Sequence, residues 1–442
     1  MLKRIVALAV LLPNIFFGQH TIKGTFSPAE DYNVALLYKV TPTLSEYITN
    51  AEIKDGILEF KLDSTATKGM YRIVYAIPQE DYNFDVIYNG KEDIVLTFNS
   101  ETGVNFQSSS ENKLLASYTN SMSMITHSIG NFYREETKDT IALKSIFKTQ
   151  REAQSSFEAL AKETIALHFI KANRPYIPET FEDVKTYVDH LKTHYFDYVD
   201  FNNETLQSSN FFEERMLNYV YGISSNDEDE VVNYKNNIDI FCDAMKNAPN
   251  ETKRVLLVDL WQQMIDLGFE NVANYISDSY LIDVAKKLND KTLVEGLTLF
   301  KNTSIGNKAP DFSFEIEKDS KKIITKLSAL NIAESYIVVF WSSTCSHCLD
   351  EIPDLQTFLK SQDTKKLKVI AIGLEEEPYK WKDLTYDFPE FIHVYGEGKW
   401  DNPIGDSYGV TSTPTYFILN KAKEIIEKPE NFEALKVFFL EE

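Results

Sequence analysis

Hydrophobic and polar residues alternate along the first part of the chain in short runs that are typical of β-strands. Between residues 20 and 105 these runs are rich in Val, Ile, Tyr and Phe, and turn-favouring pairs such as DG, KG and NG separate them. This spacing predicts an antiparallel β-sandwich-like domain, in which we find no catalytic constellation. The runs are IKGTFS, NVALLYKV, GILEFKL, GMYRIVYAI, FDVIYN and EDIVLTFN.

Beyond residue 110 the hydrophobic positions recur every three or four residues, which is the period of an amphipathic helix. We find no repeat of fixed length, so the pattern predicts an irregular helical domain rather than a solenoid. After a first helix that starts near residue 110, helices are expected over roughly 142–173, 179–198, 209–221, 230–247, 251–267 and 270–300.

A third pattern begins near residue 303, where apolar runs alternate with helical segments. YIVVFW and LKVIAIGL have the composition of buried strands, and CLDEIPDLQTFLKSQ has that of a helix. Strands of this kind between helices indicate an α/β sheet with helices on its faces. We therefore predict a multidomain chain, with a β-rich domain over 19–106, an all-α domain over 107–302 and an α/β domain over 303–442.

The first residues have the features of a secretory signal peptide over 1–18. Lys3 and Arg4 precede an apolar run from Ile5 to Leu12, and Gly18 is a small residue at the expected cleavage point. The run is shorter than the about 20 residues that span a bilayer. We expect export to the periplasm or cell envelope, with cleavage after Gly18. An anchored or buried N-terminal helix is the alternative.

The net charge and the number of cysteines argue against some classes of protein. The 442 residues carry a formal net charge of -22, which argues against nucleic acid, because phosphates require a basic surface. The three cysteines are Cys242, Cys345 and Cys348. Disulfides persist outside the cytosol, but a protein stabilised by them would carry more cysteines, spread along the chain. Two close cysteines and a distant one suggest a local dithiol and a spare thiol.

Three segments between residue 303 and the C-terminus resemble one family. They are GNKAPDFSF, VVFWSSTCSHCLDEIPDL and GVTSTPTYFIL, in this order. Together they resemble the TlpA/ResA-like exported branch of the thioredoxin superfamily. The resemblance implies a thioredoxin-like fold over 303–442 and a thiol-disulfide oxidoreductase of the protein disulfide reductase or isomerase type. It also implies protein thiols and disulfides as substrates, a membrane or periplasmic redox partner protein, and no cofactor besides a redox-active Cys345–Cys348 disulfide.

The chemistry of the dithiol can be reasoned from its place in the chain. Thiol–disulfide exchange requires an accessible thiolate, and Cys345 stands at the start of a predicted helix, where free N–H groups favour an anion. We therefore expect Cys345 to attack and Cys348, one turn further and more buried, to resolve the mixed disulfide. The imidazole of His347 can stabilise the Cys345 thiolate and so raise the reduction potential; an imidazole turned towards solvent is the alternative.

The resemblance also assigns roles around the dithiol. Pro414 matches the cis-proline of the family, so the backbone of Thr413 is expected to pair with an extended substrate segment, and Trp341 is assigned to the substrate-binding region. Val339 stands where thioredoxin carries a buried Asp. A proton acceptor for Cys348 must then come from GLEEE, in which Glu376 aligns best with the Glu that TlpA/ResA-like relatives use.

Other readings of the sequence are less well supported. A zinc site needs about four ligands, and the chain has no second CxxC motif. A peroxiredoxin requires a proline where Trp341 stands. His190 and His194 have helical i, i+4 spacing but lack the Glu of an HExxH metal site. An envelope binding or assembly protein with an inactive thioredoxin-like domain stays open, as do the direction of electron flow and the oligomeric state.

Overall fold

The structure is a computed structural model that describes residues 20–441 except 42, 44, 136–138, 223–228, 319–320 and 364. The predicted signal peptide, residues 1–18, lies outside the described residues. The chain divides into two compact units, Met1–Asp259 and Leu260–Glu442, which are described separately below. Within the described residues, no helix combines the length and the apolar character that a membrane span requires.

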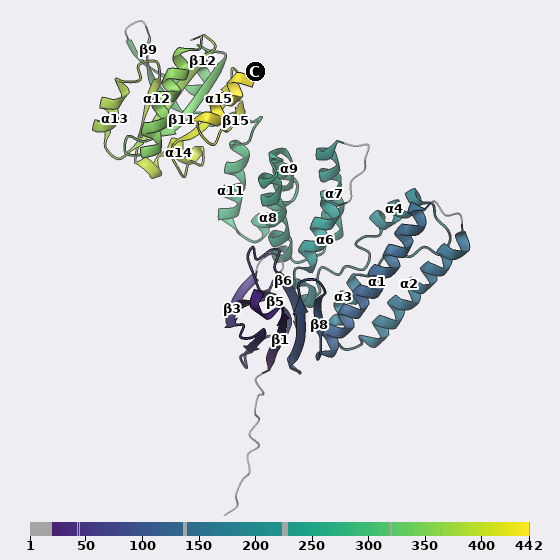
Figure 1. The fold of residues 1–442 in the computed structure, drawn as a ribbon. Helices are drawn as coiled ribbons and strands as arrows, with labels where there is room; N and C mark the ends of the chain where they lie inside the picture. The colour runs from purple at the N-terminus through teal and green to yellow at the C-terminus, as the bar shows by residue number, and fades with distance from the viewer. Residues whose placement is uncertain are drawn as a thin grey trace, which may run out of the picture. The chain divides into compact units, whose positions relative to one another are not determined.

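The N-terminal unit begins with eight strands in two four-stranded sheets, drawn in purple and dark blue in Figure 1. Their orders are β4-β1-β7-β8 and β3-β2-β5-β6. Side chains from both sheets form one hydrophobic cluster, in which Ile22, Leu37 and Leu58 are fully buried. The strands are β1 (Thr21–Ser27), β2 (Val34–Val40), β3 (Ser45–Glu52), β4 (Ile57–Lys61), β5 (Gly69–Val74), β6 (Asn83–Tyr88), β7 (Ile94–Asn99) and β8 (Gly103–Phe106).

The β-rich region predicted from the alternating pattern is present, but one pairing differs from the expected antiparallel arrangement. Strands β1 and β7 run parallel, with Ile22 opposite Ile94 and Phe26 opposite Phe98. The period of two predicts which side chains of a strand face the core, but it does not predict the partner or the direction of pairing.

The helical part of this unit follows the strands. The predicted single stretch 142–173 is two helices, because the chain turns after residue 160 and Glu163 takes a left-handed backbone conformation with φ of 66°. The helices are α1 (Ser110–Arg134), α2 (Thr140–Leu160), α3 (Ala166–Ala172), α4 (Val184–Thr193), α5 (Glu204–Gln207), α6 (Phe211–Val220) and α7 (Glu230–Ala244). The division between the units falls within α8 (Asn250–Asp266).

The C-terminal unit contains helices as well as the predicted α/β region. The helices are α9 (Glu270–Ile276), α10 (Ile282–Lys287) and α11 (Lys291–Asn302), with a π-helical turn at Ser277–Leu281. Glu270 of α9 accepts the backbone N–H of Ile305 at 2.8 Å and forms an ion pair with Lys428. These contacts connect α9 to both ends of the α/β region within one compact unit. The predicted boundary at residue 302 separates the two parts along the chain and stays a prediction.

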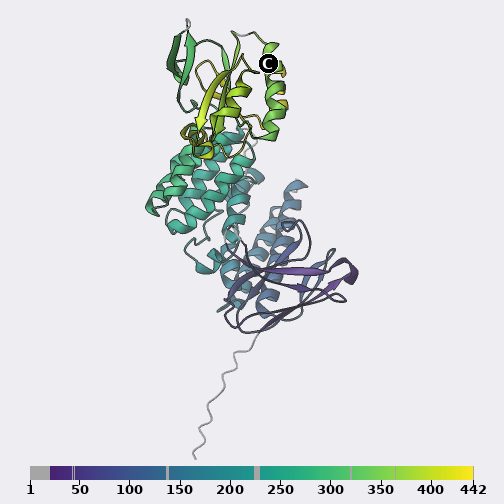
Figure 2. The same ribbon diagram turned by 90° about the vertical axis from the view of Figure 1, so that its left-hand side faces the viewer.

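The α/β region is built on a five-stranded sheet with the order β13-β12-β11-β14-β15, seen in two views in Figures 1 and 2. Strands β13, β12 and β11 pair in parallel, and the β11–β14 and β14–β15 pairings are antiparallel. The strands are β11 (Ser335–Trp341), β12 (Leu367–Glu375), β13 (Ile392–Glu397), β14 (Thr415–Asn420) and β15 (Ile425–Glu427), and a separate hairpin consists of β9 (Ser313–Lys318) and β10 (Lys321–Lys326). The helices are α12 (Ser346–Lys360), α13 (Pro378–Thr385), α14 (Pro403–Ser407) and α15 (Phe432–Glu441).

Alternate side chains of the central strand β11 enter two different hydrophobic clusters. Ile337, Val339 and Trp341 pack with residues of α12, α13 and α15. Val338 and Phe340 pack on the opposite face with residues from the 309–333 segment and with residues that follow α14. Because both faces are covered, the strand is apolar throughout, as its composition predicted. This double packing fixes the end of β11, from which the CSHC segment leaves the sheet.

Candidate redox site

The dithiol lies in the connection between the central strand and the first helix of the α/β region. Strand β11 ends at Trp341, the loop of Ser342, Ser343 and Thr344 follows, and α12 begins at Ser346 with Cys345 as its N-cap. Ser342 and Ser343 are buried, whereas Thr344 is exposed. The structure contains both Cys345 and Cys348 as thiols.

The sulfur of Cys345 takes the place of a capping oxygen at the start of α12. It accepts the backbone N–H of Cys348 at 3.2 Å, and its thiol donates to the carbonyl oxygen of Thr413 at 3.2 Å. Partial burial of the Cys345 thiol raises its pKa. Hydrogen bonds with the side chains of Cys348 and Thr413, and with the backbone N–H groups of Cys348 and His347, outweigh burial, so the pKa of Cys345 is lowered.

Cys348 has the opposite character. Its side chain is fully buried among Trp341, Ile352 and Tyr416. Burial raises the pKa of Cys348 to about 12, and the hydrogen bond with Cys345 adds to the shift. Cys345 is therefore the half-exposed thiol that ionises first, and Cys348 is the protected thiol behind it.

Thr413 and Pro414 lie directly beside the half-exposed sulfur. The peptide bond between them is cis, as the resemblance implied. Both residues are half-buried, and the Thr413 carbonyl is the acceptor for the Cys345 thiol. The structure thus brings Cys345, Cys348, Thr413 and Pro414 together from two segments that are far apart in the sequence.

Two of the predicted site residues point elsewhere. Trp341 is fully buried and packs edge-to-face on Phe388, so its ring offers no surface to a substrate, in contrast with the prediction. A large apolar side chain at the end of a strand covered on both faces belongs to the core. His347 is exposed, and its observed contribution to the site is the backbone N–H that favours the Cys345 thiolate.

The structure places Glu375, rather than Glu376, next to the loop that carries the dithiol. Glu375 is the last residue of β12 and is only 3% exposed, and its carboxylate accepts the backbone N–H of Ser343. Glu376 is the next residue and is exposed. Strand β12 continues one residue beyond its apolar run and ends at Glu375. Successive side chains in a strand point to opposite sides, so assigning the role one position further along the chain selects an exposed glutamate instead of the buried one.

A second carboxylate near the dithiol was not predicted from the sequence. Glu351 lies one turn after Cys348 on α12, accepts the hydroxyl of Tyr416 at 2.9 Å and accepts the backbone N–H of Phe432 at 2.9 Å. Burial raises the pKa of the Tyr416 phenol, and negative charge at Glu351 and at the two cysteines adds to the shift. The sequence signal that could have indicated this carboxylate is the i, i+3 spacing of Cys348 and Glu351, which places both side chains on one side of the predicted helix.

The other candidate residues of the sequence, His190, His194 and Cys242, do not come together in a metal site. His190 Nδ1 lies 2.9 Å from a Glu182 oxygen, and His194 Nδ1 lies 2.7 Å from an Asp197 oxygen, so the two rings face different carboxylates. Within the described ranges, no group of three His, Cys, Asp or Glu side chains is arranged to hold a metal ion. Cys242 is buried in α7, and burial raises the pKa of its thiol.

Comparison with known proteins agrees with this arrangement. The Thioredoxin-like family model matches residues 333–425, which include the CSHC segment and the cis-proline loop. The C-terminal region is a thioredoxin-like domain. This domain is similar to the thiol-disulfide oxidoreductase ResA of Bacillus thuringiensis, at 28% identity over 142 residues, which cover 31% of this chain and 76% of the relative. It is also similar to the thiol:disulfide interchange protein DsbE of Xylella fastidiosa, at 28% identity, covering 26% of this chain and 56% of that one.

Two solved structures are among those that match part of the chain. A domain of a possible thiol-disulfide isomerase from Cytophaga hutchinsonii is 25% identical with a TM-score of 0.27, and the match covers 31% of this chain and 92% of that one. A thioredoxin-like protein from Bacteroides caccae is 20% identical with a TM-score of 0.31, and that match covers 60% of this chain and 96% of the other.

Proposed function

We propose that this protein is a thiol-disulfide oxidoreductase that exchanges two electrons with protein thiols and disulfides through Cys345 and Cys348. The observation that carries the proposal is the asymmetry of the two thiols. Cys345 is half-exposed, caps a helix and has a lowered pKa, whereas Cys348 is buried and has a raised pKa. A nucleophilic thiolate in front of a protected resolving thiol is the arrangement that disulfide exchange requires.

In the reducing direction the reaction begins at Cys345. Its thiolate attacks one sulfur of a substrate disulfide, so that a mixed disulfide forms and the other substrate sulfur leaves as a thiolate and takes up a proton. Deprotonation of Cys345 also removes its hydrogen bond to the Thr413 carbonyl. That carbonyl can then accept an N–H from an extended substrate segment, as in strand addition.

The second step uses Cys348. Its thiol must lose a proton before its sulfur can attack Cys345, and its raised pKa makes this step depend on an acceptor. Glu375 fits this role better than the predicted Glu376, because its buried carboxylate holds the loop that carries the dithiol. Attack forms the Cys345–Cys348 disulfide and releases the second substrate thiolate, so that the substrate gains two electrons and the protein loses two.

The proposal includes export and a redox partner. A signal peptide over residues 1–18 would deliver the chain to the periplasm or cell envelope, where disulfides persist. Each turnover leaves the dithiol oxidised, so a membrane or periplasmic protein dithiol must reduce it again, or a disulfide must oxidise it if the physiological flow runs the other way. The disulfide is the redox group, and the proposed reaction needs no further cofactor.

Reduction of insulin by dithiothreitol tests the proposed activity. We expect the full-length protein to accelerate insulin precipitation, Cys345→Ser to abolish the acceleration, and Cys348→Ser to accumulate a mixed disulfide. Cys242→Ala is the matched control, because it removes a thiol outside the dithiol and should leave turnover unchanged. Wild-type protein that does not accelerate the reaction would contradict the proposal and favour the binding or assembly alternative.

The direction of electron flow is tested by the reduction potential of the Cys345–Cys348 couple in glutathione buffers. A value near about -270 mV matches thioredoxin and a reductant, and a value near about -120 mV matches a strong oxidant. Stabilisation of the Cys345 thiolate favours the reduced dithiol and therefore moves the potential towards the oxidising end.

A further inference from the structure

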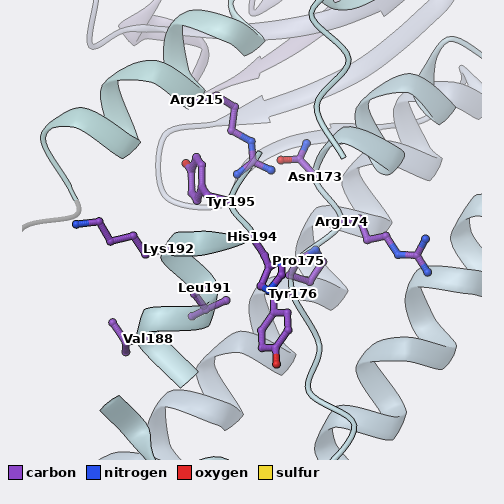
Figure 3. A pocket seen from close by; sticks show the side chains of 10 residues that line it. All are labelled: Asn173, Arg174, Pro175, Tyr176, Val188, Leu191, Lys192, His194, Tyr195 and Arg215. Atoms are coloured by element: carbon purple, nitrogen blue, oxygen red, sulfur yellow. The ribbon is translucent and has the colours of Figure 1, made fainter. Parts of the chain in front are cut away.

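The N-terminal unit contains a cavity far from the dithiol in sequence. Its volume is about 330 Å³, in the range of pockets that bind small organic molecules. It is formed by helix α4 and the two residues that follow it, by the segment at the end of α3 and by one side chain of α6, as Figure 3 shows. The lining residues are Asn173, Arg174, Pro175, Tyr176, Val188, Leu191, Lys192, His194, Tyr195 and Arg215.

The charge of this cavity is opposite to that of the chain. The sequence has 67 acidic and 45 basic residues, but the lining includes three cationic side chains and no carboxylate. Cationic concavities concentrate anions, because low-dielectric walls strengthen the field. An adjoining cavity of about 360 Å³ shares part of the wall and contains Glu179 and Asp197, so the excess of positive charge is confined to the first cavity.

Arg215 is a cation of this lining that lacks a carboxylate partner in the described part of the chain. One of its Nη atoms donates to the carbonyl of Ala172 at 2.8 Å, and its guanidinium lies 4.6 Å from the centre of the Tyr195 ring. Its Nε is buried without an acceptor, and within the described chain no carboxylate forms an ion pair with it. The adjacent Glu214 is hydrogen-bonded to Asn210 instead. A half-buried guanidinium with this environment is stabilised by an added anion.

The other two cations contribute less. Arg174 lies 3.9 Å from Glu158 and stacks on Tyr198, and its guanidinium points away from Arg215 in Figure 3. The Lys192 ammonium also points away from Arg215 and from the other lining side chains in the same view. The geometry therefore favours an anionic group at Arg215.

The rest of the wall is apolar and aromatic. Val188 and Leu191 of α4 and the ring of Tyr176 lie at the end opposite Arg215 in Figure 3, and Pro175 lies above Tyr176. The ring of Tyr176 stacks on that of His194, with centroids 4.9 Å apart and planes 9° from parallel. Flat walls of this kind bind planar apolar groups.

We propose that this cavity binds a small organic anion with an aromatic or apolar body, whose acidic group pairs with Arg215 and whose body contacts Tyr176, Val188 and Leu191. This site is independent of the dithiol and does not rest on the proposed redox function. It gives the N-terminal unit a binding activity of its own.

Binding of naphthoate to the full-length protein, measured by isothermal titration calorimetry, tests this proposal. Naphthylmethylamine has the same ring system with the opposite charge, and acetate has the carboxylate without the ring. We expect naphthoate to bind about tenfold or more tightly than either, because only naphthoate uses both the cation and the apolar wall. Equal binding of naphthoate and the amine, or no binding of naphthoate, would overturn the proposal.

Two pairs of variants locate the site. Arg215→Gln should weaken naphthoate binding about tenfold, whereas Arg134→Gln, which removes an exposed charge from the same unit, should leave it unchanged. If Arg215→Gln does not fold, Val188→Glu places a carboxylate on the wall from an exposed position and should weaken binding as strongly. Val184→Glu, at an equally exposed position one turn earlier that does not line the cavity, is its control. Unchanged affinity in Val188→Glu contradicts the proposed site.

Discussion

At Cys345 a sulfur atom occupies the position where a helix exposes its first N–H groups. These groups and the helix dipole stabilise negative charge within the first turn. The backbone N–H of Cys348 points at the sulfur at 3.2 Å, whereas the Cys348 sulfur lies inside the hydrophobic core. The two thiols differ because one meets oriented dipoles at the surface and the other meets apolar side chains.

The first prediction concerns the pH dependence of alkylation in the reduced protein. Reactive thiolate appears as pH rises through the pKa, so Cys345 should react with iodoacetamide with a midpoint below the about 8.5 of a free cysteine. Cys348, with a pKa of about 12, should stay protonated and unreactive throughout this range. Mass spectrometry of each peptide measures both rates. Equal midpoints, or faster reaction at Cys348, would show that the assignment of the nucleophile is wrong.

The second prediction concerns the carboxylate beneath the loop. Glu375→Gln preserves an oxygen that can accept the Ser343 N–H but removes the base, so the resolution step should slow by about 100-fold. Glu376→Gln, at the exposed neighbouring position, is the matched control and should change the rate little. Rapid-quench analysis of the mixed disulfide measures this step. A larger effect at Glu376 would restore the assignment made from the sequence.

At the scale of elements, Glu351 connects three parts of the thioredoxin-like domain. It lies on α12, and it accepts hydrogen bonds from Tyr416 of β14 and from the first residue of α15. The hydroxyl of Tyr416 thus ties the helix that carries the dithiol to the strand that follows the cis-proline loop. This connection holds the two halves of the site in register.

The third prediction follows from this connection. Tyr416→Phe keeps the ring in the core and removes one hydrogen bond to a carboxylate, which should lower the stability of the C-terminal unit by about 1.5–3 kcal/mol. Tyr379→Phe, at a residue that is 76% exposed, should leave stability unchanged. Chemical denaturation of the two variants measures the difference. Equal stabilities would mean that the Tyr416 hydroxyl does not contribute.

The elements also show what sequence alone could and could not predict. The apolar run of β11 identified a strand covered on both faces, and the CSHC segment with the distant Pro414 identified the thioredoxin-like domain. The break at Glu163 was missed, because its left-handed backbone belongs to a residue type that fits a helix equally well. The end of β12 was placed one residue early, because the strand closes with a charged residue whose burial depends on a contact with the loop.

At the scale of the whole molecule, each compact unit has its own hydrophobic core. The two sheets of the N-terminal unit share one cluster, and the five-stranded sheet of the C-terminal unit lies between two others. Stability of the first core and chemistry at the dithiol therefore depend on different sets of contacts. The net charge of -22 favours solubility and leaves the cationic cavity of the N-terminal unit as a local exception.

The fourth prediction tests this separation. Leu58→Ala removes a fully buried side chain from the N-terminal core and should lower the stability of that unit by about 2–5 kcal/mol. The alkylation rate of Cys345 should not change. Ile337→Ala, in the core beside the dithiol, is the comparison and should affect the C-terminal unit instead. Calorimetry and alkylation on the same samples give both readouts; a slower or faster Cys345 in Leu58→Ala would contradict the separation.

The most direct test of the central claim is a redox titration of the intact protein in glutathione buffers, with alkylation trapping and mass spectrometry of all three cysteines. We predict that Cys345 and Cys348 become protected together as the buffer becomes more oxidising, along one two-electron transition, while Cys242 stays unchanged. Thiols at Cys345 and Cys348 that give the same alkylation pattern in every buffer would contradict the account.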